Sequence, residues 1–465
     1  MEQKIKKVLV IGAGYAGLAC SYELVKHNID VVLIEKTNSI GGLSSTVSLK
    51  NVKFELGPHI YFNKDKDVNK LWKELIGDKL KSYKRNNKIF YKGKFIDSPL
   101  NIFNVVSKIG VLRSISYPIS LMWYKLLKFN KSPKNSKEWV IFNFGKKLYD
   151  DFFEVFNQKI WWLKCEEISV DWTGQRIKSS LYKIVAKSLL KDEDFIIKTF
   201  NFPDGGSETI YNSFLTKLIQ YNNFKLYLNT NLEDITTDNF CFKVNSNNFR
   251  NSNFTDIIST IHLSDLNDVI RSNCINYKII NDNINNLKYR NLIIVNFVFK
   301  KEDVQNFQEH WIDIHDSSIK ALRVTNFGNY NFGLSNDKNT GIGVEYNCFE
   351  SDDIWHLDDL SISKLALNDL KNMNLINQNY VDFKVIKISK AYPIYFDGYK
   401  EFLNPIINEF SKINNLQLVG RNSMYKWNNM HHSVKTGILA AKNILGENYD
   451  LNLVRGMVSF GKETD

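Results

Sequence analysis

The sequence predicts an α/β protein with a Rossmann-like dinucleotide-binding domain, a helical insert and an antiparallel β-sheet domain for the substrate. Three observations support this fold class. A strand, a glycine-rich turn and a helix open the chain, the middle has the apolar spacing of helices, and strand-like alternation fills much of the second half. A length of 465 residues suggests roughly two to four domains.

The first element is a short β-branched strand that leads directly into a glycine motif. Lys7–Gly12 reads KVLVIG, as expected for a parallel strand buried on both faces, and Leu18–His27 has helical character. Asp30–Glu35 is a second strand that ends in an acid. Together these segments make one βαβ unit, which is the context that makes a GxGxxG motif indicate dinucleotide binding.

Each glycine of this motif has its own expected role. Gly12 permits the tight turn, Gly14 lets a pyrophosphate approach the backbone, and Gly17 lets the helix lie close to the sheet. The helix amino terminus offers unpaired N–H groups to the phosphates, and Glu35 accepts from the ribose hydroxyls. The neighbouring residues counted with this site are Tyr15, Ala16 and Lys36. An ordinary glycine-rich strand–helix turn is the structural alternative.

A second glycine pair favours FAD over NAD. Gly41 and Gly42 follow soon after the acid, where the longer pyrophosphate–ribityl arm of a flavin needs a closely approaching backbone. Gly57, Pro58 and His59 come next and are expected at the flavin face. The other expected cofactor contacts of this stretch are Leu43 and Ser44.

The middle of the chain changes from strands to helices and back. Ile89–Leu100 reads as two short strands around a Lys-Gly turn, and Asn101–Leu190 is mostly helical in pattern. A helix is expected from about Glu208. Phe224–Ile235 is interpreted as one strand passing the adenine, and Asp256–Ile261 as a buried strand returning to the nucleotide-binding sheet.

The last part of the chain holds a second strand-rich region and a closing helix. Alternating strands fill about Tyr289–Tyr346, and a helix is expected to run through Ile444. No linker or repeat is visible, so the domains are expected to be interleaved. The expected boundaries are 1–75, 201–265 and 401–465 for the FAD-binding domain, 76–100 and 266–400 for the sheet domain, and 101–200 for the helical insert.

Several of these motifs resemble one group of flavoproteins. The runs GGLSST at residues 41–46 and FELGPHIYF at residues 54–62 resemble the start of the group that joins amine oxidases, protoporphyrinogen oxidase and UDP-galactopyranose mutase. Phe144–Lys178 resembles the mutase branch more specifically. The residues of that segment in register are Phe144, Asn157, Lys159, Trp161, Trp172 and Arg176.

The resemblance implies a substrate site. Arg176 and Arg323 would bind the diphosphate of a nucleoside-diphosphate sugar, because a guanidinium fork binds phosphate through two hydrogen bonds. Two surface or ion-paired arginines are the alternative. Arg176 and Arg323 are counted as catalytic together with His59, which would contact the flavin near N5. Tyr330 and Tyr399 would donate to the phosphates, with core packing as the alternative. The remaining implied substrate contacts are Phe152, Phe156, Asn157, Trp161 and Trp427, and the closing flavin contacts are Gly420, Arg421, Asn429 and Ser433.

The reaction implied by this resemblance is a mutase-like exchange of pyranose and furanose rings through an adduct between flavin N5 and the sugar. FAD would act in its reduced form, with reducing equivalents from a flavin-reducing partner or NAD(P)H, and the product would feed surface polysaccharide biosynthesis. One alternative is an FAD-dependent oxidoreductase of the amine oxidase or protoporphyrinogen oxidase type. A second alternative is a non-catalytic flavin-binding sensor.

Two single positions and one short motif depart from the pattern of the mutase branch. Ser98 stands where the family usually has a tyrosine, and Trp427 stands where a tyrosine is common. Met430–Ser433 reads MHHS where the family usually has Gln-Asp-His-Ser. These departures leave a nucleotide sugar as the expected substrate but put UDP-galactose itself in doubt.

Composition excludes several other classes of protein. The formal charge is 61 − 50 = +11, which is interpreted as a lysine-rich surface without a nucleic-acid partner. Five scattered cysteines without a CxxC pair indicate neither a disulfide framework nor a metal site. The apolar stretch Ile109–Leu127 is too short and interrupted to span a bilayer. A cytoplasmic enzyme is expected, either as a single chain or as a homo-oligomer.

Overall fold

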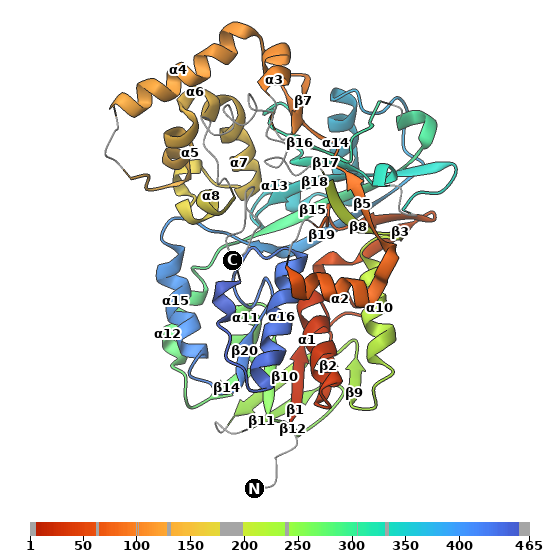
Figure 1. The fold of residues 1–465 in the computed structure, drawn as a ribbon, viewed down its shortest axis with the longest axis vertical. Coiled ribbons are helices and arrows are strands. Elements are labelled where there is room, and N and C mark those ends of the chain that lie inside the picture. Colours follow the sequence, from red (N-terminus) through yellow and green to blue (C-terminus); the bar gives the residue numbers. More distant parts are fainter. Residues whose placement is uncertain are drawn as a thin grey trace.

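The structure is a computed structural model, and the residues that it describes are 6–61, 65–98, 100, 102–127, 132–176, 199–237, 241–304, 306–330 and 334–454. Within these ranges, the side chains of residues 102 and 174–176 lie outside the description. Strands and helices alternate along the chain and build several sheets, which confirms the predicted α/β class. Figure 1 shows a lower part around a parallel sheet and an upper part in which a large sheet and a group of helices lie side by side.

The parallel sheet of the lower part is assembled from segments far apart in the sequence. Its strands, in the order β20-β13-β1-β2-β9, are Leu416–Leu418, Asp256–Ser259, Lys7–Ile11, Asp30–Ile34 and Phe224–Tyr227. All neighbours run parallel, and β1 and β2 are almost continuously buried, as the β-branched runs of the sequence predict. The expected first strands and the return strand at Asp256 are therefore confirmed.

Four helices pack around this sheet. They are α1 (Tyr15–Lys26), α2 (Lys66–Ile76), α10 (Glu208–Leu218) and α16 (Met430–Ile444). α1 and α16 approach so closely at Gly437 that an added Cβ there would overlap the backbone oxygen of Ala16. The first and last parts of the chain thus form one body, with a shared core that includes Leu18, Val434 and Ile438.

The expected single strand at Phe224–Ile235 is wrong. The chain turns after β9, with Asn229 at a φ of 50°, and β10 (Leu232–Thr237) enters a different sheet. That four-stranded sheet has the order β12-β11-β10-β14, with the other strands at Ser252–Phe254, Phe242–Ser246 and Ile270–Ser272. Beside it lie the helices α11 (Leu263–Val269) and α12 (Tyr277–Ile284).

The upper part contains a seven-stranded, mostly antiparallel sheet. In the order β19-β15-β18-β17-β16-β6-β7, its strands are Asp382–Pro393, Tyr289–Lys300, Asn339–Cys348, Arg323–Asn326, Trp311–Ile314, Asn87–Tyr91 and Lys94–Ser98. The helices that follow or precede these strands are α13 (Asp353–His356), α14 (Asp359–Asn372) and α15 (Tyr399–Phe410). Two short ribbons connect the parts, β3 (Thr46–Leu49) with β4 (Val52–Glu55) and β5 (Leu80–Lys84) with β8 (Thr199–Pro203).

Helices between β7 and β8 form the insert. They are α3 (Ile102–Ile109), α4 (Val111–Leu127), α5 (Ser136–Phe144), α6 (Lys146–Leu148), a π-helical turn at Tyr149–Phe153, α7 (Glu154–Trp161) and α8 (Val170–Arg176). None of the helices described in this structure is long and apolar enough to cross a membrane. In Figure 1 the insert lies at the upper left, and α4 forms its outer edge.

One buried lysine fastens the insert to the large sheet. Lys159 on α7 donates from Nζ to the backbone oxygens of Asp316, Ile319 and Ala321 at 2.7, 2.6 and 3.0 Å. Those carbonyls belong to the loop between β16 and β17. Burial lowers the pKa of Lys159 to about 8, so the ammonium form still predominates at neutral pH. The three bonds fix α7 against the strands that carry Asp313 and Arg323.

Lys159→Met should destabilise the protein by on the order of 3 kcal/mol, because three buried carbonyls lose their donor. Urea unfolding followed by circular dichroism measures this loss. Lys301→Met, which changes an exposed lysine, is the matched control and should leave the unfolding midpoint unchanged. Equal midpoints for the two variants would contradict the anchoring role of Lys159.

Candidate functional site

The turn between β1 and α1 combines two glycines required by the fold with one that the fold does not require. Gly12 has a φ of 100°, and a Cβ there would overlap the Thr260 hydroxyl. A Cβ at Gly17 would overlap the backbone oxygen of Gly12. At Gly14, by contrast, an added Cβ meets no atom of the described residues within 4 Å. The space above Gly14 is open, and α1 begins there without a side-chain cap.

The acidic strand end and the second glycine pair surround this open space. Glu35 accepts from the backbone N–H of Ala13 at 2.8 Å and from that of Thr37 at 3.0 Å. Gly41 donates from its N–H to Ala13 at 2.9 Å and forms a bridge to Gly14. Lys36 is exposed beside Glu35. The two glycine loops therefore meet at Gly14, as the prediction of a pyrophosphate site requires.

Two other predicted cofactor residues take part in packing. The Tyr15 hydroxyl donates to the backbone oxygen of Ser207 at 3.0 Å, which fixes the buried ring toward the start of α10. Ala16 lies against Gly420, because a Cβ at Gly420 would come within 3.2 Å of the Ala16 Cβ. These side chains hold the glycine turn in place.

A narrow pocket lies where the two parts of the molecule meet. It is lined by Leu43, Leu56, His59, Leu292, Ile388, Ala391, Tyr392 and Arg421. Gly57, at a φ of 107°, turns the chain toward Pro58 and His59, and Ser44 is buried in the 3₁₀ turn Gly42–Ser44. The pocket therefore joins the predicted flavin segments to side chains of the large sheet.

His59 is half-buried at this pocket, and its Nε2 atom is shielded from solvent. Its Nε2 has no hydrogen-bond partner among the described residues. Burial and the nearby Arg421 guanidinium lower the pKa of His59 to about 4, so the imidazole is neutral at pH 7. A neutral ring with one unused nitrogen can form a hydrogen bond with a cofactor edge.

The closing segment of the chain ends at the amino terminus of α16. Gly420 donates to the Thr436 hydroxyl at 3.1 Å, and Arg421 donates from Nε to the backbone oxygen of Asn428 at 3.0 Å. Asn429 caps α16, and the N–H of Ser433 donates to the backbone oxygen of Asn429 at 3.0 Å. The predicted closing residues thus lie together beside α1.

A buried arginine that sequence reasoning missed lies next to this pocket. Arg290 on β15 is 3% exposed, and its Nε and Nη1 have no hydrogen-bond partner within the described part of the chain. Its guanidinium lies 4.3 Å from the ring centre of Tyr392 and 4.9 Å from that of Trp427. Burial lowers the pKa of Arg290 to about 9, and Arg421 and Arg323 act in the same direction.

The backbone explains why Arg290 projects here. Arg290 pairs with Tyr392 across β15 and β19, and the register shifts between Arg290 and Leu292. Bulges of this kind bend a strand and redirect a side chain next to functional sites. Arg421 lies 4.4 Å from the same Tyr392 ring, so Tyr392 contacts both guanidinium groups and connects the pocket with Arg290.

Aromatic rings from three segments pack together beside Arg290, whose guanidinium lies over the rings of Trp161, Tyr392 and Trp427. Trp427 stacks on Trp172 with centroids 4.1 Å apart and meets Trp161 edge-on at 4.8 Å. Tyr395 stacks on Trp161 at 6.0 Å and on Tyr399 at 4.8 Å. We call Trp161, Trp172, Tyr392, Tyr395, Tyr399 and Trp427 the aromatic cage. It joins the insert, the large sheet and the closing segment.

Arg323 is paired with acids that the sequence did not identify. It donates from Nε to Asp313 at 2.8 Å, and its Nη1 lies 3.6 Å from a carboxylate oxygen of Glu345. Burial raises the pKa of Glu345, which Arg323 opposes. The side chain of Arg323 is 19% exposed. The ion-paired alternative for this arginine is therefore realised, and any ligand contact would come from its remaining donors.

The other predicted substrate residues are distributed over several surroundings. Phe152 stacks on Tyr91 at 4.9 Å, and Phe156 stacks on His315 at 4.1 Å, so both rings pack the insert against the sheet. Tyr330 belongs to a separate apolar cluster with Phe200 and Phe202. The structure does not bring Phe152, Phe156 or Tyr330 into the aromatic cage.

Two predicted contacts lie in α7 and α15. Asn157 is 7% exposed, and its Nδ2 has no hydrogen-bond partner among the side chains and backbone that the structure describes. The Tyr399 hydroxyl donates to Asp171 at 3.2 Å, which ties the cage to α8. Arg176 ends α8, and its side chain lies outside the described residues.

The residues required for FAD fit the group. Gly14 leaves an opening at an uncapped helix start, the two glycine loops meet there, and His59 offers an unused nitrogen in the adjoining pocket. Among the residues described here, no three His, Cys, Asp or Glu side chains gather as a possible metal site.

The family described as flavin containing amine oxidoreductase matches residues 15–445. The chain belongs to this family. Its cofactor is FAD. The resemblance seen in the glycine motifs is thereby confirmed.

Individual relatives are more distant. The chain is 23% identical over 214 residues to dTDP-fucopyranose mutase from Escherichia coli, covering 45% of this chain and 54% of that protein. It is 22% identical over 166 residues to a probable UDP-galactopyranose mutase from Klebsiella pneumoniae, covering 35% and 43%. The chain therefore aligns with about half of the length of these curated relatives.

Solved structures match over nearly the whole chain. A crystal structure of reduced UDP-galactopyranose mutase has a TM-score of 0.85 and 19% identity, with 97% of each chain covered. A redesigned putrescine oxidase has a TM-score of 0.66 and 15% identity, covering 95% of this chain and 98% of the oxidase. At such identities the likeness establishes the shared fold.

Gly14→Val should abolish flavin binding while leaving the fold intact. The backbone at Gly14, with φ −76° and ψ −179°, suits any residue, and the new side chain would point into the open space instead of the protein. The purified variant should be colourless and should melt at the temperature of flavin-stripped wild type, since bound ligand stabilises the native state.

Gly437→Val is the contrasting control for this experiment. Its Cβ would overlap the Ala16 backbone oxygen, so it should lower the melting temperature even of flavin-stripped protein. A yellow, flavin-saturated Gly14→Val variant would show that the pyrophosphate does not occupy the open space above Gly14.

Proposed function

We propose that this flavoprotein is a mutase-like enzyme that interconverts pyranose and furanose rings of a nucleoside-diphosphate sugar, in surface polysaccharide biosynthesis. The observation that carries the proposal is Arg290. Its guanidinium is buried, lies against aromatic faces and has two nitrogens without a hydrogen-bond partner among the described residues. A buried cation in this state is costly unless an anion reaches it, and a diphosphate is such an anion.

The position of Arg290 relative to the flavin pocket supports the same substrate class. Tyr392 contacts Arg290 on one side and lines the pocket of His59 on the other. A diphosphate at Arg290 would place a sugar joined to it near the pocket. Trp427 and Trp161, both nearly buried, would exclude water and pack against the sugar or the base.

Arg323 and Arg176 complete the proposed anion site. Asp313 holds Arg323 through Nε, which orients the guanidinium and leaves other N–H groups for a phosphate oxygen. Arg176 lies four residues after Trp172 on α8, about one helical turn away. Because the Trp172 ring stacks on Trp427, the backbone of Arg176 is close to the aromatic cage. Three arginines would then hold the diphosphate when it leaves the sugar and when it returns.

Among the described residues that line the pocket there is no carboxylate to act as a base in the oxidation of an amine. When bound and reduced, FAD supplies the nucleophile for the anomeric carbon and carries the covalent chemistry. His59 is neutral at pH 7 and would donate or accept a hydrogen bond at the cofactor edge, which fits a positioning role. Asp313 and Glu345 both lie against Arg323, so their charge is engaged by that guanidinium.

Redox dependence tests the proposed function directly. Dithionite-reduced enzyme should isomerise many molecules of a UDP- or dTDP-linked sugar, seen as new ring signals by NMR, without consuming reducing equivalents. Oxidised enzyme should bind the same compound and form no product. Stoichiometric anaerobic bleaching of oxidised flavin by an amine or a nucleotide sugar would instead favour the oxidoreductase alternative.

Arg290→Met should separate ligand binding from stability. Removing one charge-assisted contact should weaken UDP or dTDP binding by roughly tenfold to a hundredfold, equivalent to about 1.5–3 kcal/mol. Because an unpaired buried charge is replaced by an apolar chain, the melting temperature of the enzyme should stay equal or rise. Calorimetric titration and thermal melts measure the two effects.

Arg250→Met is the control for Arg290→Met, because Arg250 is an exposed arginine paired with Glu233 on another sheet. It should change neither nucleotide affinity nor flavin content. If Arg290→Met lowered the melting temperature and left UDP and dTDP affinity unchanged, Arg290 would be a structural residue.

A further inference from the structure

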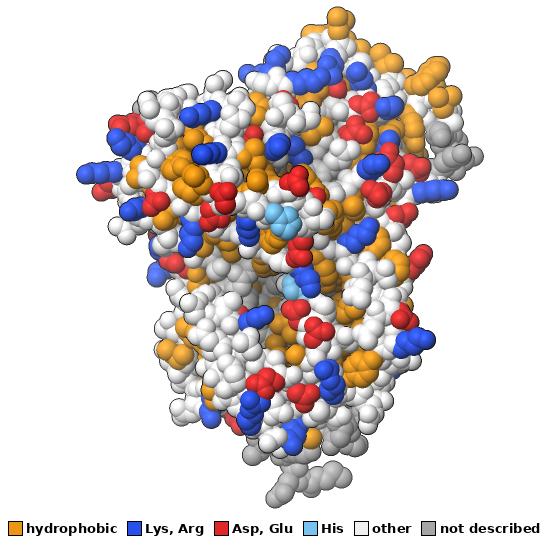
Figure 2. Space-filling model, turned by 180° about the vertical axis from the view of Figure 1, so that it is seen from behind, with side chains coloured by type: hydrophobic (Ala, Val, Ile, Leu, Met, Phe, Trp, Pro, Cys, Tyr) orange, Lys and Arg blue, Asp and Glu red, His pale blue; other side chains and the backbone are white. Residues whose placement is uncertain are grey.

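The outward face of α4 is covered with apolar side chains. Along this helix the exposed positions repeat every three or four residues, and Leu112, Trp123 and Leu126 are 88%, 66% and 75% exposed. Every side chain of this face except Pro118 is a large hydrophobic one. The members of the face, here called the α4 stripe, are Val111, Leu112, Ile115, Pro118, Ile119, Met122, Trp123, Leu126 and Leu127. Figure 2 shows hydrophobic side chains gathered over this edge of the molecule.

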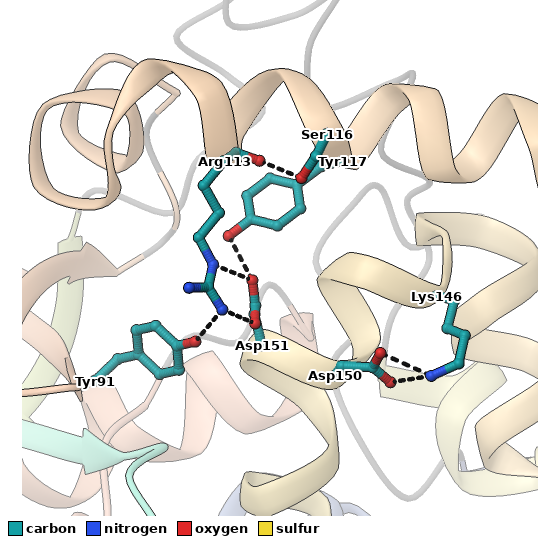
Figure 3. Close-up of polar contacts among 7 residues, drawn as sticks. All are labelled: Tyr91, Arg113, Ser116, Tyr117, Lys146, Asp150 and Asp151. Carbon is teal, nitrogen blue, oxygen red and sulfur yellow. Dashed lines mark hydrogen bonds and ion pairs between the residues drawn. The ribbon is translucent and has the colours of Figure 1, made fainter.

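The inward face of the same helix is polar. Arg113 donates from Nε to Asp151 on the π-helical turn at 2.8 Å, and its Nη2 bonds the second oxygen of that carboxylate. The Tyr117 hydroxyl donates to Asp151 at 3.0 Å, and Arg113 also donates to the Tyr91 hydroxyl at 3.3 Å. Figure 3 shows these side chains converging below α4.

Further contacts hold the helix in this orientation. Ser120 accepts from the N–H of Lys147 at 3.1 Å, and Lys125 lies over the Phe142 ring. A Cβ at Gly145 would come within 2.7 Å of the Leu121 backbone nitrogen, so α4 lies directly against the next helices. Rotating the apolar stripe inward would break all of these bonds.

This arrangement reverses the usual polarity of a surface helix. A helix on a globular protein normally turns its apolar side to the core and its charged side to water. A contiguous exposed apolar face marks a surface that another molecule covers. The polar inward face shows that the outward stripe does not result from a rotated helix.

The charges around the stripe indicate the kind of molecule that covers it. Between Asp97 and Glu138 the sequence contains seven lysines and arginines and no aspartate or glutamate. Of these, Arg113 is paired with Asp151 and Lys137 with Glu166, whereas Lys108 is exposed at the end of α3. Phe103 of α3 is also 70% exposed. An apolar helix face with flanking cations is complementary to the surface of an anionic bilayer.

We propose that α3 and α4 bind the enzyme to the surface of an anionic membrane. α4 has 17 residues, which is shorter than the roughly 20 that a membrane-spanning helix needs. It would therefore lie along the interface, with the α4 stripe in the acyl region. Trp123 suits this depth because its ring is apolar and its N–H bonds to headgroups or water. Lys108 would remain among the lipid phosphates.

A second copy of this chain is the less favourable occupant. A two-fold contact through the stripe would place the same patch of both chains together. Such a contact would bring the lysine- and arginine-rich 98–137 segments of both copies together, and that segment contains no aspartate or glutamate to pair with the added charge. This occupant remains a separate outcome of the experiment below.

The test is co-sedimentation of the flavin-loaded full-length enzyme with vesicles. Wild type should bind vesicles containing phosphatidylglycerol at least tenfold more tightly than pure phosphatidylcholine vesicles at low salt, and high salt should reduce the difference. Leu112→Gln, Trp123→Gln and Leu126→Gln combined should lower the partition coefficient tenfold or more. Lys108→Gln should lower it by roughly fivefold for the anionic vesicles alone.

Matched substitutions elsewhere control for the loss of exposed apolar area. Ile219→Gln, Leu360→Gln and Leu453→Gln combined change side chains of similar exposure far from α4 and should leave binding unchanged. Retained yellow colour shows that each variant is folded. Absence of wild-type binding to anionic vesicles, or equal binding by both triple variants, overturns the proposal. So does a lipid-free dimer of wild type that the α4 variant alone converts to monomer, since the second copy would then be the occupant.

Discussion

The ammonium group of Lys159 links the position of the insert to the position of the charged strands. It binds three carbonyls of the loop between β16 and β17, and those two strands carry Asp313 and Arg323. Trp161 follows on the same helix, two residues away. If these three hydrogen bonds were lost, Trp161 of the aromatic cage and Arg323 of the large sheet would no longer be held at a fixed distance from each other. A single buried cation thus sets the geometry of two components of the candidate site.

The two arginines of the large sheet illustrate different uses of a buried charge. Arg323 is compensated by Asp313 and Glu345, so its energy is low before any ligand arrives. Arg290 has only aromatic faces and a distant acid, and part of its hydrogen-bonding capacity is unused. Stability alone would favour an apolar residue at Arg290. Its presence is explained if the fold accepts a local cost in order to bind an anion.

The sequence predicted the dinucleotide-binding unit well because the determinants are local. Gly12, Gly14 and Gly17 act within one turn, and the strands on each side follow from short runs of β-branched residues. Arg290 could not be found in this way, because it is one charge in a strand and its environment depends on β19, the closing segment and the insert. The bulge beside it left no signal in the sequence.

Other differences have the same origin. Phe152, Phe156 and Tyr330 belong to motifs that resemble the mutase branch, yet their rings pack against Tyr91, His315 and Phe202, so their substrate contacts stay predictions. The apolar run Ile109–Leu127 could be judged only by length and interruptions. Which side of α4 faces the protein depends on Asp151, a residue more than twenty positions beyond the helix, and local periodicity cannot supply that.

The strand order of the parallel sheet has a consequence for synthesis of the protein. β1 emerges first from the ribosome, but its neighbour β13 is made only after more than half of the chain, and β20 follows near the end. Contacts between strands far apart in the sequence are slow to form, because the entropy of closing the long loop is lost before the contacts can stabilise the fold. β1 can pair early with β2, but its other edge stays unpaired until β13 is made. A nascent chain with an open apolar strand edge is a substrate for chaperones, and its yield is expected to depend on the rate of translation.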